Sequence, residues 1–97
     1  MKVVWTLQAV RDLAEARAYV ERDNPKAAAE LARRILQATA RLTKHPEMGR
    51  RGKLPGTREL IVSRVPYVIL YRIREGRIDL LRVLHAMRRY PPGSHSS

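Results

Sequence analysis

The spacing of apolar residues changes at Arg58, and this change limits the chain to folds that combine helices with a sheet. Before Arg58, residues 7–22 carry apolar side chains at helical spacing, and Thr6 precedes them as a helix cap. Asn24 and Pro25 then mark the start of a second helix, because these residue types are favoured at the cap and at the first helical position. The break between the two helices is short, which predicts an antiparallel helical hairpin.

After Arg58 the sequence is typical of β-strands. The expected strands are RELIVSR at 58–64, YVILYRI at 67–73 and RIDLLRVLH at 77–85, in addition to KVVW at 2–5. The expected fold class is therefore α+β: an N-terminal strand, and an antiparallel two-helix hairpin packed on one face of a small antiparallel sheet that three C-terminal strands complete. Residues 1–91 are expected to form one domain, and residues 92–97 a polar, disordered tail.

The register of the last two strands predicts an apolar surface that the helices do not cover. A turn at Glu75 and Gly76 places Arg72 opposite Asp79, and the same register gives the sheet two apolar faces. One helical hairpin can cover one face, so the other is expected to bind a partner. The residues assigned to this partner-binding face are Tyr67, Ile69, Tyr71, Leu80 and Arg82.

Charge points to an acidic partner or a nucleic acid. The 97 residues include 20 Lys and Arg against 9 Asp and Glu, a formal net charge of +11. Residues 48–97 carry 11 basic and 3 acidic side chains, and ten of these basic residues are arginines, which suit phosphates and carboxylates.

Several classes of site are not predicted. The chain has no cysteine, so disulfides and thiolate metal sites are excluded. The three histidines are scattered without ligand spacing, and GRRGKLPGT lacks the spacing of a phosphate-binding P-loop, so neither a metal nor a cofactor is expected. No apolar run reaches the length of a membrane span and the N-terminus has no signal-peptide core, which favours the cytoplasm.

The order of these segments resembles the RelE/ParE superfamily of toxins from bacterial type II toxin–antitoxin systems, and the ParE-like members more than the RelE-like ones. The similar segments are DL at 12–13, NPKAA at 24–28, HPEMGRRG at 45–52, GTREL at 56–60, PYVILYRI at 66–73 and LLRVLHAMRRYP at 80–91. The resemblance implies a cytoplasmic toxin that forms a hetero-oligomer with an acidic-tailed antitoxin, and that reaches operator DNA only through this antitoxin. The antitoxin would then be the partner of the uncovered sheet face.

The resemblance leaves two targets open, the ribosome with its mRNA and DNA gyrase. RelE-like toxins cleave mRNA with an arginine on the third strand, and here that position falls at about Val68, which has no charge. If the chain is nevertheless a ribonuclease, the candidate catalytic residues are Arg58, Arg82, His85 and Arg88. Gyrase inhibition, as in ParE-like toxins, is the preferred function, with His85 in a structural role.

A third possibility is a domain that binds nucleic acid without sequence specificity. It ranks last because both helices carry mixed charge and neither has the pattern of a recognition helix. The residues expected to contact a target or a nucleic acid are Arg50, Arg51, Lys53, Arg88, Arg89 and Tyr90.

Overall fold

A computed structural model describes residues 1–87 of the chain. In chain order the elements are β1 (Lys2–Trp5), α1 (Leu7–Glu21), α2 (Pro25–Leu42), β2 (Arg50–Arg51), β3 (Arg58–Ile61), β4 (Tyr67–Arg74) and β5 (Arg77–His85). The strands form one sheet in the order β1-β5-β4-β3-β2, in which β1 runs parallel to β5 and all other neighbours are antiparallel. The α+β fold expected from the sequence is confirmed, and the expected domain limit at residue 91 and the tail from 92 lie outside the described residues.

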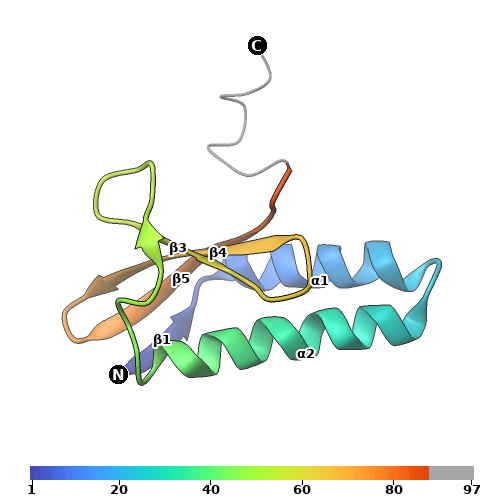
Figure 1. Ribbon diagram of the computed structural model, residues 1–97, viewed down its shortest axis with the longest axis horizontal. Coiled ribbons are helices and arrows are strands. Elements are labelled where there is room, and N and C mark those ends of the chain that lie inside the picture. Colours follow the sequence, from blue (N-terminus) through green and yellow to red (C-terminus); the bar gives the residue numbers. More distant parts are fainter. Residues whose placement is uncertain (88–97) are drawn as a thin grey trace, which may run out of the picture.

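Both helices begin at the expected caps. The Thr6 side chain accepts a hydrogen bond from the backbone N–H of Ala9 at 3.2 Å, and the Asn24 side chain accepts one from Ala27 at 3.0 Å. Two residues, Arg22 and Asp23, separate the end of α1 from this second cap, so the helices return antiparallel and lie together on one side of the sheet (Figure 1).

A β-bulge in β5 decides which side chains face the helices. The register matches the expected one from the turn to the Tyr71–Leu80 pair, but Leu81 is then an extra residue, and Leu70 pairs with Arg82. Every pair beyond the bulge is displaced by one position from the expected register. Val83 therefore points into the core under the helices, whereas Arg82 lies opposite Leu70 on the other face.

The main core lies between the helices and one face of the sheet. Its fully buried side chains include Ile35 and Leu42 from α2, Ile69 and Tyr71 from β4, and Leu80 from β5. A second, smaller cluster on the opposite face consists of Leu70 and Leu84 with Leu81 packed against them. The sheet thus has two apolar faces, as the sequence predicts, but their sizes are unequal.

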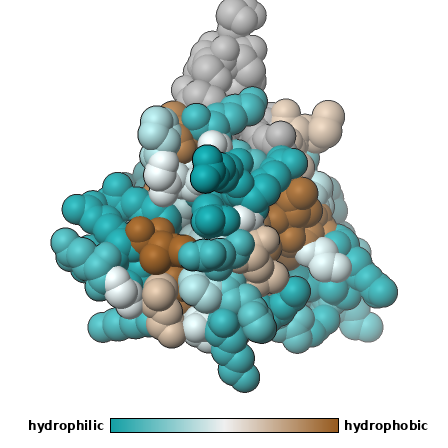
Figure 2. All heavy atoms as spheres, turned by 60° about the vertical axis from the view of Figure 1, so that its left-hand side comes forward, coloured by the Kyte–Doolittle hydropathy of each residue, from teal (hydrophilic) through white to brown (hydrophobic). Residues whose placement is uncertain are grey.

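Apolar surface on the side shown in Figure 2 is broken into separate areas among hydrophilic residues. The most exposed large apolar side chains in the described chain are Met87 at 83%, Tyr19 at 67%, Leu7 at 65% and Ile61 at 60%. Tyr19 and Leu7 belong to α1, Ile61 belongs to β3, and Met87 follows β5. Neither helix is long and apolar enough to cross a membrane, among the residues described.

Candidate functional site

The loop that follows α2 is fixed to the sheet by two side chains. The Tyr71 hydroxyl donates to the carbonyl of Pro46 at 2.7 Å and accepts from the backbone N–H of Gly49 at 2.9 Å. Burial raises the pKa of this hydroxyl, so it remains a donor across the physiological range. Arg58 donates to the carbonyls of Glu47 and Gly49, at 3.1 and 2.7 Å. The guanidinium of Arg58 thus supports the loop.

Asp12 of α1 holds the bulged part of β5. Its carboxylate accepts two hydrogen bonds from Arg82, at 2.8 and 3.2 Å, and one from the backbone N–H of Val83 at 2.9 Å. Gln8 donates a fourth at 3.0 Å. Because the Asp12 side chain is 6% exposed and that of Arg82 is 28% exposed, this bidentate pair is largely shielded from water. Arg82 therefore pairs with an acid of its own chain.

His85 ends β5 in a structural arrangement. Its Nδ1 accepts a hydrogen bond from the backbone N–H of Met87 at 3.1 Å, which places the ring proton of a neutral imidazole on Nε2. The ring also meets Tyr67 edge-on, with centroids 5.2 Å apart.

The structure does not bring the candidate ribonuclease residues together. Arg58 lies on β3 and Arg82 on β5, with β4 between them. The Arg58 guanidinium bonds backbone carbonyls of the loop after α2, whereas that of Arg82 bonds Asp12 of α1. His85 pairs with Tyr67 of β4, four residues from Tyr71, which is the β4 partner of Arg58. Four residues correspond to about 13 Å along a strand. Arg88, the fourth candidate, lies outside the described residues.

The sheet face that was expected to stay open for a partner is the face that the two helices cover. Tyr67 is 8% exposed, and Ile69, Tyr71 and Leu80 are 0% exposed, because all four side chains belong to the core under the helices. Arg82 is the member of the expected set that lies on the opposite face. The assignment of the two faces was therefore wrong, since the helices cover the face that contains the tyrosines.

Of the residues expected to contact a target or a nucleic acid, three lie in or next to β2. Arg50 and Arg51 form β2, and Arg50 is paired with Glu59 at 3.1 Å, whereas Lys53 lies in the exposed connection from β2 to β3. This connection projects away from the helices (Figure 1). Arg89 and Tyr90 lie outside the described residues.

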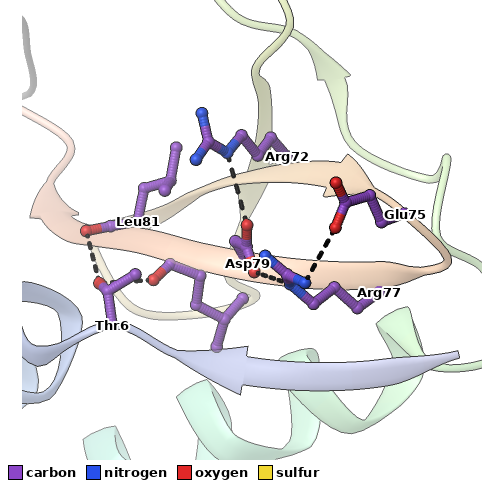
Figure 3. Close-up of polar contacts among 7 residues, drawn as sticks. Thr6, Arg72, Glu75, Arg77, Asp79 and Leu81 are labelled. Carbon is purple, nitrogen blue, oxygen red and sulfur yellow. Dashed lines mark hydrogen bonds and ion pairs between the residues drawn. The ribbon is translucent and has the colours of Figure 1, made fainter.

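A chain of ion pairs crosses the β4–β5 hairpin on the face away from the helices (Figure 3). Arg77 contacts Glu75 at 3.4 Å and Asp79 at 2.9 Å, and Asp79 also contacts Arg72 at 3.5 Å. The sequence predicted only the pair of Arg72 and Asp79. Figure 3 also shows Leu81 on the same side of the sheet as Arg72, so charges border the smaller apolar cluster.

The ion pairs of Asp79 make stability depend on acid pH. The hydrogen bond from Arg77, followed by the charges of Arg77 and Arg72, lowers the pKa of this carboxyl below its ordinary value of 3.8. A lowered pKa in the folded state stabilises the fold above pH 3.8, and this stability is lost as the pH falls through the folded pKa. Between pH 2 and pH 6, the free energy of unfolding measured in urea is expected to fall less steeply with decreasing pH for Asp79→Asn than for the parent chain. An equal slope in both proteins would contradict the assignment.

Residues 3–90 match the family described as the ParE toxin of the type II toxin–antitoxin system parDE. The chain belongs to this ParE toxin family. The candidate toxin Y4kP of Sinorhizobium fredii is 42% identical over 90 residues, which cover 93% of each chain. Toxin RelE2 of Caulobacter vibrioides is 39% identical over 87 residues, 90% of this chain and 97% of the relative.

A solved structure of a ParE-containing system has the same fold. A chain of the chromosomal ParDE toxin–antitoxin system from P. aeruginosa matches with a TM-score of 0.80 and 25% identity, over 88% of this chain and 95% of that one. The resemblance expected from the ordered sequence segments is therefore confirmed.

Proposed function

We propose that this ParE-family chain is a toxin that arrests growth by inhibiting DNA gyrase, and that an antitoxin with an acidic segment neutralises it in the cytoplasm. The observation that supports gyrase over RNA cleavage is the separation of Arg58, Arg82 and His85. RNA cleavage through the 2′-hydroxyl needs a base, an acid and cations around one phosphate. Arg58 and Arg82 lie on strands that β4 separates, and each is engaged by a different structural partner.

An antitoxin partner fits the charge of the chain and its similarity to a ParDE system. The net charge of +11 favours a partner rich in carboxylates, and operator DNA would be reached through that partner. In the smaller apolar cluster on the other face, Leu70 and Leu84 are also buried and only Leu81 is partly exposed, so the charge of the chain supports the partner more than open apolar surface does.

The target is tested by inducing the chain without antitoxin. Gyrase inhibition predicts DNA breaks, an SOS response and intact mRNA in cells, and loss of supercoiling activity when purified gyrase meets purified toxin. Ribosome-dependent mRNA cleavage is the second candidate, because toxin RelE2 is 39% identical to the chain. Rapid cleavage of translated mRNA, with gyrase unaffected, would replace the first candidate by the second.

Replacing His85 by alanine separates the two functions at one residue. The growth arrest is expected to stay within about twofold of the parent, because the imidazole contributes one exposed hydrogen bond, worth about 1 kcal/mol. A general base contributes roughly 100-fold or more to a rate, so a ribonuclease that used His85 would lose its toxicity. The measurement is the inducer concentration that halves the growth rate, corrected for protein level. Thermal unfolding of the purified variant serves as the control for stability.

A further inference from the structure

Three basic residues lie side by side across one end of the sheet. The register places Arg77 of β5 opposite Arg74 of β4 on one side and opposite Lys2 of β1 on the other. Ile78, which follows Arg77, belongs to the core under the helices, so the basic row points to the face away from the helices. Like charges directly opposite one another destabilise a sheet, and an anion lying across the row would remove this repulsion.

Arg72 is joined to this row through a carboxylate that it shares with Arg77. The largely buried side chain of Asp79 accepts from Nε of Arg77 at 2.9 Å and from Nε of Arg72 at 3.5 Å. Because both contacts use Nε, the two terminal nitrogens of Arg72 and one of those of Arg77 have no acceptor among residues 1–87. Figure 3 shows the terminal nitrogens of Arg72 turned away from Asp79. One acid thus holds two guanidinium groups in place and leaves N–H donors available to an anion.

The other two cations have no partner in the described part of the chain. Lys2 and Arg74 are exposed, and neither side chain forms a hydrogen bond or an ion pair with residues 1–87. The basic residues therefore outnumber the two acids of the hairpin, Glu75 and Asp79, and this end of the sheet carries excess positive charge. We name this group the hairpin cation cluster, and its members are Lys2, Arg72, Arg74 and Arg77.

We propose that the hairpin cation cluster binds the phosphate backbone of duplex DNA. The planar donor fork of arginine matches the oxygens of a phosphate group, and a guanidinium that is held in position before contact loses less entropy on binding. Phosphate contacts carry no sequence information, so recognition of an operator stays with the antitoxin. The inference goes beyond the proposed growth arrest and does not depend on it, because the toxin chain itself makes the contact.

The make-up of this surface favours duplex DNA over an acidic protein and over a single-stranded nucleic acid. Every side chain that the hairpin presents on this face from Arg72 to Asp79 is charged, whereas the centre of a protein interface is depleted in charged residues. Single strands bind through aromatic rings that stack on their bases, and the tyrosine in this part of β4, Tyr71, is fully buried. Duplex DNA requires neither feature, because its phosphates lie on the outside and cations that reach them release counterions.

The test measures how salt weakens binding of the purified chain to a fluorescent DNA duplex of arbitrary sequence. Each phosphate contact contributes about 0.9 to the slope of the logarithm of the binding constant against that of the salt concentration. Arg72→Gln and Arg74→Gln are each expected to reduce this slope by about 0.9 and to weaken binding roughly tenfold near 0.1 M salt. The matched control is Arg17→Gln, which removes an exposed arginine of α1 on the helical side of the molecule (Figure 1) and should leave the slope unchanged.

Arg74→Gln keeps the test decisive if Arg72→Gln proves less stable. Its side chain forms no ion pair within residues 1–87, so the variant is expected to unfold at the temperature of the parent. An unchanged salt slope for a folded Arg74→Gln variant would overturn the inference. An equal reduction by Arg17→Gln would overturn it too, because the attraction would then come from the net charge of +11 as a whole.

Two further ligands identify the occupant. If both hairpin variants keep their binding to duplex DNA but lose binding to a polyglutamate peptide, the occupant is an acidic protein segment and the inference is overturned. A loss confined to single-stranded RNA of the same length would overturn it in the same way. None of these assays contains gyrase or an antitoxin, so a failure of the gyrase proposal would leave their results unchanged.

Discussion

Replacing Asp12 by alanine is expected to lower the free energy of unfolding by about 3 kcal/mol, the range found when one partner of a buried ion pair is removed. The carboxylate accepts from Arg82, from Gln8 and from the backbone of Val83, and alanine provides none of these acceptors. The N–H of Val83 then remains buried without a partner, and the largely buried guanidinium of Arg82 loses its counter-charge. Equilibrium unfolding in urea measures the change.

Two further variants show which part of the Asp12 contact matters. Asp12→Asn keeps an oxygen that can accept from Val83 but removes the charge opposite Arg82, so its loss of stability should lie between the parent and Asp12→Ala. Glu30→Ala removes an acid of α2 whose pairs with Arg33 and Arg34 are exposed, and its effect should be much smaller. Equal losses for Asp12→Ala and Glu30→Ala would contradict a structural role for the buried carboxylate.

The second large effect is expected for Gly49→Ala, with a loss of about 2 kcal/mol from overpacking. A Cβ atom at this position would lie 2.7 Å from the Tyr71 hydroxyl and 2.8 Å from the backbone oxygen of Glu59. The tyrosine ring is fully buried and the oxygen belongs to β3, so neither moves without disturbing the sheet. The φ angle of Gly49 is not positive, and the cost therefore comes from space alone.

A double-mutant cycle with Tyr71→Phe tests this explanation. Tyr71→Phe alone removes the hydroxyl that bonds Pro46 and Gly49 and should cost about 1–3 kcal/mol. Gly49→Ala should cost less in the Tyr71→Phe background, because the contact with the hydroxyl is gone, while the contacts with the ring carbon Cε1 and with the Glu59 oxygen remain. Strictly additive losses in urea unfolding would contradict a direct clash between the added methyl group and the hydroxyl.

Local sequence signals predicted the helices and the turns because their determinants lie within a few residues. Thr6, Asn24 and Pro25 fix the helix starts through bonds to neighbouring backbone, and Glu75 with Gly76 forms the predicted turn. The family could also be predicted, since it depends on the order of such segments along most of the chain.

The bulge and the faces of the sheet could not be predicted locally. Thr6 donates from its hydroxyl to the carbonyl of Leu80 at 2.7 Å and of Leu81 at 3.3 Å, and Asp12 accepts from the N–H of Val83, so α1 fixes the irregular part of β5 from a distant part of the sequence. One signal was available: Asp12 lies on the same helical stripe as the buried Ala9 and Ala16, where an acid needs a buried partner.

The pairing of β1 with β5 also sets when the chain can finish folding during its synthesis. Lys2 lies opposite Arg77, and Trp5 lies opposite Leu80, so the first strand has no neighbour until the last strand has been translated. An early release of the nascent polypeptide, before residue 77, leaves both the edge strand and the Asp12 carboxylate without their partners. Incomplete translation products should therefore stay unfolded and harmless to the cell that makes them.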